Sequence, residues 1–151
     1  MTTFRPAGPA DIDDVYAIEQ ACSLNPWTRD GLAAETANPN ALFLLAQTPE
    51  NQIVGFACAV IVLDELHILE TAVKPGFRGN GVGTKLMLRL LSDAAGKNAG
   101  RAYLEVRGSN RSAIRVYEKC GFGRDGVRKG YYQDGEDAVL MGRALRAAPL
   151  F

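Results

Sequence analysis

The chain has 151 residues, of which 47% are hydrophobic and 23% charged, a composition typical of a globular domain. Its 17 basic and 17 acidic residues balance, so the charge points neither to nucleic acid nor to an anionic membrane as a partner. The single histidine, His67, argues against a histidine-based metal site, and the three cysteines lack a CxxC spacing. We therefore expect one domain over residues 1–151, without a metal, in a reducing, cytoplasmic compartment.

The first third of the chain predicts two helices. The N-terminal segment MTTFRPAGPADIDD is acidic and polar, so we expect no signal peptide there. Ile12, Val15, Ile18 and Cys22 then recur at helical spacing, with acidic residues early in the segment. Thr28 is a suitable N-cap for a second, shorter helix.

The middle third predicts three strands and a long helix. The apolar segments ALFLLAQ (41–47) and QIVGFACAVIVL (52–63) are separated by the polar TPEN and predict a hairpin. The second segment is too short and too rich in β-branched residues to span a membrane. A further strand is predicted over LHILETAV (66–73). The apolar residues of 82–95 keep the 3.6-residue period of an amphipathic helix.

The last third predicts a strand, a helix and a final pair of strands. AYLEV (102–106) predicts a short buried strand, and NRSAIRVYEKCGF (110–122) predicts a helix with Asn110 or Ser112 near its start and Gly121 at its end. YYQDGEDAVLMGRAL (131–145) predicts two strands around a turn. We therefore expect an α/β fold whose neighbouring strands need not all be parallel.

A glycine-rich turn, RGNGVG (78–83), lies between the third predicted strand and the long helix. Free backbone N–H groups and the helix dipole make a helix start attractive to anions, and glycine lets a phosphate approach the backbone. From the glycine spacing alone, a tight turn without a ligand explains the segment about equally well. Neither the P-loop pattern nor the dinucleotide pattern GxGxxG fits it.

The pattern Arg78-x-x-Gly81-x-Gly83 resembles the acetyl-CoA motif Q/R-x-x-G-x-G/A of the GNAT acetyltransferase superfamily. The resemblance implies the GNAT fold, with a mixed, mostly antiparallel central sheet, a splayed strand pair and flanking helices, and it implies acetyl-CoA as cosubstrate. It also implies that the loop amides bind the pyrophosphate and that the preceding strand binds the pantetheine arm. The cofactor-binding residues implied in this way are Thr71, Ala72, Val73, Arg78, Gly79, Asn80, Gly81, Val82, Gly83, Thr84, Asn110 and Tyr117.

Four further segments resemble one branch of that superfamily, the RimI-like protein N-terminal acetyltransferases. They are NPWT (25–28), YLEVRGSNRSAIRVYEKCGF (103–122), RKGYY (128–132) and GEDAVLM (135–141). The resemblance implies acetyl transfer to the N-terminal α-amine of a protein, by direct attack in a ternary complex. The acceptor that it implies is the N-terminal alanine of small-subunit ribosomal protein eighteen, so the expected partner is the N-terminal peptide of a ribosomal protein.

Acetyl transfer to an amine needs a base for the ammonium and a proton donor for the departing thiolate. An α-amine, with a pKa near about 8, is deprotonated more easily than a lysine at about 10.4. The resemblance implies Glu105 as the general base and Tyr117 as the general acid. From the residues alone, Glu105 is equally a solvent-facing carboxylate or a partner of Arg107, and Tyr117 is a core aromatic packed beside Ile114.

The resemblance also implies a substrate site. Tyr131 and Tyr132 match a pair that lines the peptide groove, with a cross-strand aromatic pair as the alternative. Trp27 can cover the peptide site, whereas a buried tryptophan in the turn before a helix is the commoner case. Glu70 replaces an asparagine that is common in this branch, so it can alter substrate choice or act as a second carboxylate. The EDA segment, 136–138, stays open between structure and substrate contact.

Several residues depart from the pattern or have a second explanation. Gly79 stands where many members have arginine or lysine, which removes one phosphate partner. Asn110 can cap a helix, contact the cofactor, or do both. His67 lies near the place where some GNAT members carry their base, but we rank it behind Glu105. Cys120 follows a helix whose dipole raises a thiol pKa, which disfavours an acetyl-cysteine intermediate.

Two other functions compete with protein acetylation. A small-molecule N-acetyltransferase predicts a more acidic cleft and has no need of a tyrosine-lined groove. A non-catalytic sensor of acyl-CoA has no need of both Glu105 and Tyr117.

Overall fold

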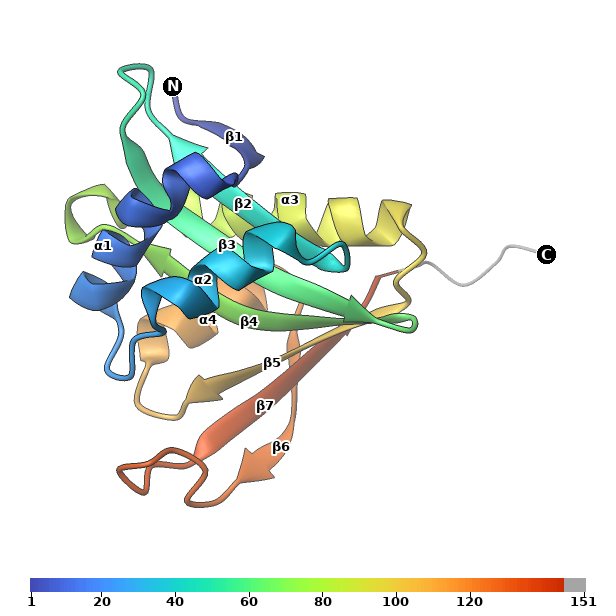
Figure 1. Ribbon diagram of the computed structural model, residues 1–151. Coiled ribbons are helices and arrows are strands. Elements are labelled where there is room, and N and C mark those ends of the chain that lie inside the picture. Colours follow the sequence, from blue (N-terminus) through green and yellow to red (C-terminus); the bar gives the residue numbers. More distant parts are fainter. Residues whose placement is uncertain (146–151) are drawn as a thin grey trace.

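The computed structural model describes residues 1–145 and arranges them around one open sheet of seven strands (Figure 1). The spatial order is β1-β2-β3-β4-β5-β7-β6, and all neighbours are antiparallel except β4 and β5. The strands are β1 (Thr3–Pro6), β2 (Ala41–Gln47), β3 (Ile53–Val62), β4 (Glu65–Val73), β5 (Arg101–Arg107), β6 (Gly123–Arg128) and β7 (Ala138–Ala144). The helices are α1 (Ile12–Cys22), α2 (Arg29–Ala37), α3 (Val82–Gly96) and α4 (Arg111–Lys119), with short 3-10 turns η1 (Pro9–Asp11) and η2 (Pro75–Phe77).

The helices cover both faces of the sheet and bury a core against each (Figure 1). Side chains of β2 alternate between the two cores: Phe43 and Leu45 pack with α1 and α2, whereas Leu44 and Ala46 pack with α3. Each large apolar side chain buried in this way contributes roughly 1.5–3 kcal/mol to folding. In Figure 1, α1 and α2 lie over β2, β3 and β4, which leaves that face of β5, β7 and β6 without a helix in the described part of the chain.

The sheet opens between β4 and β5. These two strands run parallel and pair only over Glu65, Leu66 and His67, opposite residues 101–103. Beyond His67, β4 stays paired with β3 but no longer with β5. A shift in the β3–β4 register leaves Leu69 without a partner, which is a β-bulge and bends the strand. The splayed strand pair and the mostly antiparallel sheet predicted from the sequence are thereby confirmed.

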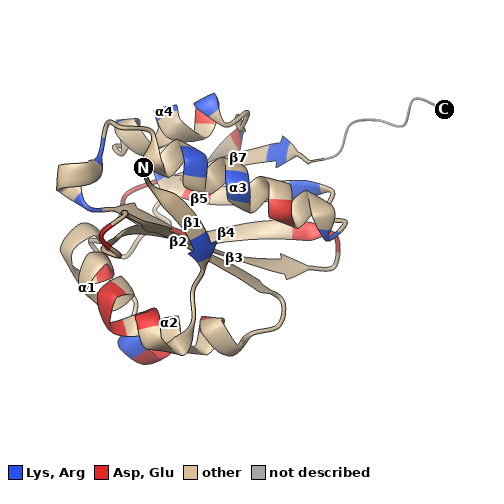
Figure 2. Cartoon of the chain, turned by 90° about the horizontal axis from the view of Figure 1, so that it is seen from above, with Lys and Arg blue, Asp and Glu red and all other residues tan. Residues whose placement is uncertain are grey.

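Charged residues differ between the two helical layers (Figure 2). The charged side chains of helix α1 are all acidic, Asp13 and Asp14 among them. By contrast, α3 and α4 together carry more basic than acidic residues. The basic residues of these two helices are Lys85, Arg89, Arg111, Arg115 and Lys119. The layer that follows the glycine-rich turn is therefore the more positive one, which favours an anionic ligand on that side.

The predicted elements agree with the structure except at the two edges of the sheet. Thr28 caps α2 by accepting a hydrogen bond from the amide of Gly31, 3.0 Å long, as expected. The prediction of a strand through Tyr131 and Tyr132 is wrong, because both lie in the loop between β6 and β7. Within that loop, the amide of Tyr132 donates to the carbonyl of Glu136, which folds the segment back on itself. The last strand pair is instead β6 with β7.

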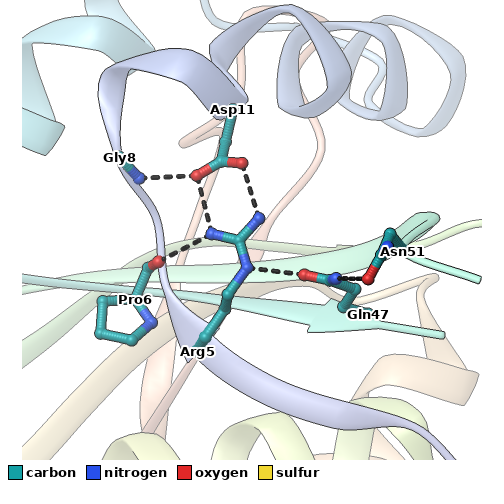
Figure 3. A network of polar contacts seen from close by, with 6 residues as sticks. All are labelled: Arg5, Pro6, Gly8, Asp11, Gln47 and Asn51. Carbon is teal, nitrogen blue, oxygen red and sulfur yellow. Dashed lines mark hydrogen bonds and ion pairs between the residues drawn. The ribbon is translucent and has the colours of Figure 1, made fainter. Parts of the chain in front are cut away.

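Strand β1 was not predicted. It pairs with β2, Phe4 packs against the core, and a network of polar contacts around Arg5 adds to these (Figure 3). The Arg5 guanidinium donates to both carboxylate oxygens of Asp11, at 2.9 and 2.7 Å, and to Gln47 on β2 at 2.6 Å. Gly8 also donates its amide to Asp11, at 2.8 Å. The Arg5 hydrogen bond lowers the pKa of Asp11, so this ion pair persists at acidic pH. The network fixes the edge of the sheet and the entry into α1.

Candidate active site

A pocket of about 850 Å³ lies where β4 and β5 part, on the face that α1 and α2 leave uncovered. Its walls come from α1, the segment before α2, β4, β5, α4, β6, β7 and the loop between β6 and β7. Nine predicted site residues line it: Trp27, Glu70, Thr71, Ala72, Glu105, Asn110, Tyr117, Tyr131 and Tyr132. The structure thus brings together residues that are far apart in the sequence.

Glu105 projects from β5 onto the uncovered face. Its strand neighbours Leu104 and Val106 are buried on the opposite face, as the alternation of a strand requires. The Glu105 carboxylate lies 3.6 Å from the guanidinium of Arg128. It also accepts a hydrogen bond from the Tyr131 hydroxyl, which raises the pKa of Tyr131. The expectation that Glu105 faces solvent agrees with its exposed position, whereas the predicted pairing with Arg107 is wrong, because the guanidinium near its carboxylate belongs to Arg128.

Tyr117 reaches the same gap from α4. Its hydroxyl lies 2.9 Å from the hydroxyl of Thr71 on β4, while its ring packs edge-on against Phe122 with centroids 6.1 Å apart. Burial raises the pKa of Tyr117, the Thr71 hydrogen bond opposes this, and the charge of Glu70 raises it further. The phenol is therefore protonated at neutral pH. The ring fills the core, as periodicity suggested, and its hydroxyl is still placed to donate a proton.

Two carboxyl groups meet at the inner wall of the pocket. Glu19 on α1 is completely buried, and its Oε2 accepts a hydrogen bond from the Trp27 amide at 3.0 Å. Glu70 on β4 is hydrogen-bonded to Glu19. Burial, with that hydrogen bond and the charge of Glu19, raises the pKa of Glu70 to about 8, and a backbone hydrogen bond from Thr71 opposes the shift. Glu70, which the sequence offers as a second carboxylate, therefore forms a pair with Glu19.

An arginine and two tyrosines form the opposite wall. The guanidinium of Arg107 stacks over the Tyr132 ring, 4.2 Å from its centroid, and Tyr131 packs edge-on against Tyr132 at 5.1 Å. Arg107 also binds Asp134 at 2.8 Å and Glu136 at 3.0 Å. These contacts tie the loop between β6 and β7 to β5, so the two tyrosines are held in place.

The EDA segment has structural contacts. Glu136 accepts a hydrogen bond from the Ser109 amide at 2.8 Å, and this bond together with Arg107 lowers the pKa of Glu136. Asp137 accepts a hydrogen bond from the amide of Gly130 at 2.9 Å. Both residues therefore join the tyrosine-bearing loop to its neighbours. Of the two roles that the sequence left open, structure and substrate contact, these contacts favour structure.

The glycine-rich turn lies outside the pocket lining, at the start of α3. Gly79 and Gly81 have φ of +80°, and a Cβ at either position would meet no atom within 4 Å, so their backbone is open to a ligand. Gly81 is the N-cap of α3 and provides no side chain to cap it, so the first N–H groups of the helix can bind an anion. These residues fit the pyrophosphate of acetyl-CoA, together with Asn80, Val82, Gly83 and Thr84.

The strand before the turn is partly occupied by protein contacts. The Arg78 guanidinium donates to the carbonyl of Val73 at 2.8 Å and lies 3.4 Å from the thiol of Cys22. Arg78, predicted to bind the cofactor, therefore faces β4 and α1 in this structure.

Asn110 caps α4 by accepting a hydrogen bond from the Ala113 amide at 3.2 Å, and it also lines the pocket.

Two further candidates, Cys120 and His67, make packing contacts. Cys120 is buried behind α3, and burial raises the pKa of its thiol. It is absent from the pocket wall, so its position gives no support to an acetyl-cysteine intermediate. His67 lines the outer end of the pocket, stacked on Tyr103 with centroids 5.6 Å apart and 3.0 Å from Glu65.

Residues 1–145 contain no cluster of three or more His, Cys, Asp and Glu side chains that could hold a metal ion. In the same part of the chain, every helix is too short or too polar to cross a membrane.

Sequence reasoning missed three pocket residues: Glu19, Arg107 as a ring-stacking group, and Arg128. For Glu19 a signal existed. It stands four residues after Val15 and three before Cys22, inside the apolar stripe of α1, where a carboxylate is out of place. The arginine contacts had no such signal, because they depend on strand pairing over long separations.

Comparison with known proteins agrees with this architecture. Residues 12–122 match the acetyltransferase (GNAT) family. The ribosomal protein bS18-alanine N-acetyltransferase of Haemophilus influenzae is 38% identical over 136 residues, which cover 87% of this chain and 90% of that protein. The enzyme of the same description from Escherichia coli K12 is 33% identical over 144 residues, covering 93% and 96%.

A solved structure points the same way. The crystal structure of the ribosomal-protein-S18-alanine N-acetyltransferase from Escherichia coli matches with a TM-score of 0.90 at 30% identity, and covers 99% of this chain and 97% of that one. The resemblance that the sequence motifs indicated is therefore confirmed. The chain belongs to the acetyltransferase (GNAT) family, in its RimI-like branch, and is an N-acetyltransferase that uses acetyl-CoA.

Proposed function

We propose that this enzyme acetylates the N-terminal α-amine of a protein that begins with alanine, and that its acceptor is ribosomal protein bS18, the substrate named for its relatives. We assign the activity to one domain spanning the chain, in the cytoplasm. The observation that carries the proposal is a single pocket with Glu105 on one side of the gap between β4 and β5 and Tyr117 on the other.

The two residues have complementary tasks in this proposal. Glu105 takes a proton from the substrate α-ammonium, directly or through a water molecule. The amine nitrogen then forms a bond to the acetyl carbon while the carbon–sulfur bond of acetyl-CoA breaks. Tyr117 gives its proton to the departing sulfur, and the second proton that the nitrogen loses returns through solvent to the Tyr117 phenolate. Its raised pKa supports this role, because the phenol keeps its proton until the thiolate forms.

The pocket walls suit a peptide terminus. Trp27 is half-buried on one side, and Tyr131 and Tyr132 stand on the other, held by Arg107 and Arg128. Aromatic walls contact an extended peptide backbone through large, rigid surfaces. A short extended N-terminus therefore fits between them, with its first residue at the inner end of the pocket.

The proposal is tested by incubating the protein with acetyl-CoA and two matched heptapeptides that begin with alanine and contain one internal lysine. One has a free N-terminus and the other is N-terminally formylated. Tandem mass spectrometry is expected to place one acetyl group on the α-amine of the free peptide and none on the blocked one. Acetylation of lysine in both peptides, or of small amines alone, would overturn the proposal and favour the small-molecule alternative.

A further inference from the structure

Glu19 has an unusual environment for a glutamate. Its side chain is fully buried, and no backbone or basic side-chain donor in residues 1–145 bonds its Oε1, which leaves a protonated neighbouring carboxyl group as the donor. A buried acceptor without a donor costs roughly 1–3 kcal/mol, so native structures nearly always satisfy such atoms. Because Glu19 lines the pocket, this oxygen is within the same site as the reacting groups.

The neighbour of Glu19 is another carboxyl group, that of Glu70. A carboxyl group donates a hydrogen bond only when it is protonated. One proton shared between the two carboxyl groups therefore satisfies the pair, and burial raises the pKa of Glu70 to about 8 in keeping with this. The pair then carries a single negative charge at neutral pH.

No basic side chain neutralises that charge in the described part of the chain. The pocket arginines are engaged elsewhere, Arg107 with Asp134 and Glu136, and Arg128 with Glu105. The charge of Glu70 acts on Cys58 of β3 and on Tyr117 of α4, Glu35 of α2 acts in turn on Cys58, and none of these groups is a cation. A positively charged ligand group is the partner that this wall lacks.

We propose that Glu19 and Glu70 together bind the α-ammonium group of the acceptor peptide before transfer, so that Glu70 is a substrate-binding residue distinct from the base, Glu105. The proposal rests on the proposed function for the identity of the acceptor. An ammonium group has three donors and can satisfy Glu19 Oε1 and the Glu70 carboxylate together. It replaces the shared proton, which is released to solvent as the ammonium enters.

The position of the pair fits this role. Glu70 precedes Thr71 on β4, and Thr71 is hydrogen-bonded to Tyr117 at 2.9 Å. Glu105 belongs to β5 across the gap. An ammonium group on Glu70 therefore lies beside the transfer site, with the base on the other wall. Since the pair stabilises the ammonium form, it contributes affinity rather than rate, and the amine is freed only when Glu105 takes its proton.

The test compares affinity for an alanine-initiated heptapeptide with a free N-terminus against the same peptide with an acetylated N-terminus. Isothermal titration calorimetry uses enzyme saturated with CoA, in the wild type, Glu70→Gln and Glu50→Gln. Glu50 lies in the exposed turn between β2 and β3 and controls for the loss of one carboxylate. We expect the wild type and Glu50→Gln to favour the free peptide by about tenfold, a difference of about 1.4 kcal/mol, and Glu70→Gln to lose that preference.

Steady-state kinetics give a second measurement, the separate changes in KM and kcat, which would not follow this pattern if Glu70 had only a packing role. In Glu70→Gln the peptide KM is expected to rise about tenfold while kcat stays within threefold and acetyl-CoA affinity is unchanged. Retention of the free-peptide preference by Glu70→Gln, or a fall in kcat with unchanged KM, would overturn the proposal. If the enzyme instead acetylates only small amines, the proposed function fails. The same comparison with the accepted amine and its N-acetyl derivative then tests the pair.

Discussion

Thr71 and Tyr117 are joined through their hydroxyl groups, 2.9 Å apart, so that strand β4 positions the proton donor carried by helix α4. The bond lowers a tyrosine pKa that burial has raised. The threonine therefore adjusts the acid as well as orienting it.

Replacement of Tyr117 by phenylalanine removes the hydroxyl and keeps the ring against Phe122. We expect kcat to fall by about 100-fold or more, the scale of general acid catalysis, with acetyl-CoA affinity within threefold. Steady-state kinetics and calorimetric titration with acetyl-CoA measure the two quantities. Unchanged turnover would exclude Tyr117 as the acid.

Replacement of Thr71 by valine removes the interaction that lowers the Tyr117 pKa. The pKa then rises further, so the phenol keeps its proton to higher pH. We expect the basic limb of the kcat profile to move to higher pH, if proton donation by Tyr117 is what that limb reports. A pH–rate profile of the two proteins between pH 6 and about 10.5 measures the shift. A basic limb at the same pH in both would assign it to another group.

Replacement of Glu105 by glutamine retains size and removes the carboxylate that faces Arg128 and Tyr131. The expected result is a loss of about 100-fold or more in kcat, because the group that takes the proton in the proposed function is gone. Glu118→Gln on the exposed side of α4 is the matched control and is expected to retain activity. Equal turnover of both variants would show that another group takes the proton.

Glu70 makes the stability of the fold depend on pH. Its pKa is 4.5 in the reference state and about 8 in the folded protein, so the folded state binds more protons between these values. The stability present below pH 4.5 is therefore lost progressively as pH rises through about 8. The loss is at most about 5 kcal/mol at about 1.4 kcal/mol per pKa unit. Urea unfolding at pH 5 and pH 9 measures it, and Glu70→Gln should flatten the difference.

The turn before α3 distinguishes two glycines. Gly81 has a φ of +80°, whereas Gly76 in η2 has no positive φ, and neither would have a Cβ contact within 4 Å. Gly81→Ala is expected to cost about 1 kcal/mol in unfolding free energy and to weaken acetyl-CoA binding at least tenfold. Gly76→Ala should do neither. Calorimetric titration of both variants with acetyl-CoA tests this, and equal affinities would remove the loop from the cofactor site.

The sequence predicted the elements whose signals are local. Thr28 and Asn110 cap their helices as proposed, because a capping side chain bonds to an amide three residues away. Strand β6 carried no such signal: all six of its residues are exposed, so it has no buried alternate face. The turn in YYQDGEDAVLMGRAL predicts a strand through Tyr131 and Tyr132, but the contacts of Arg107 across the loop hold both residues outside the sheet.

The active-site pairings could be predicted only in part. Family resemblance brought Glu105 and Tyr117 to attention, but not the fact that Tyr131 and Arg128 hold Glu105. Glu19 lies inside a stripe of apolar residues, so the helical spacing of that stripe predicts a core and not a carboxylate in the site. Its pairing with Glu70 depends on how α1 lies against β4, which the bulge at Leu69 helps to set and which no short motif encodes.

The parting of β4 and β5 also has a consequence for aggregation. An open sheet normally exposes two edges, and unpaired strand edges attract other strands. Beyond the paired residues this sheet has two more edges in its interior, one on β5 after Tyr103 and one on β4 after His67. The edge of β4 is the relevant one here. Because β5 and α4 flank that edge, a single slender extended chain can reach it but a second sheet cannot. The fold thereby keeps a strand-pairing surface for a ligand without offering it to another copy of the protein.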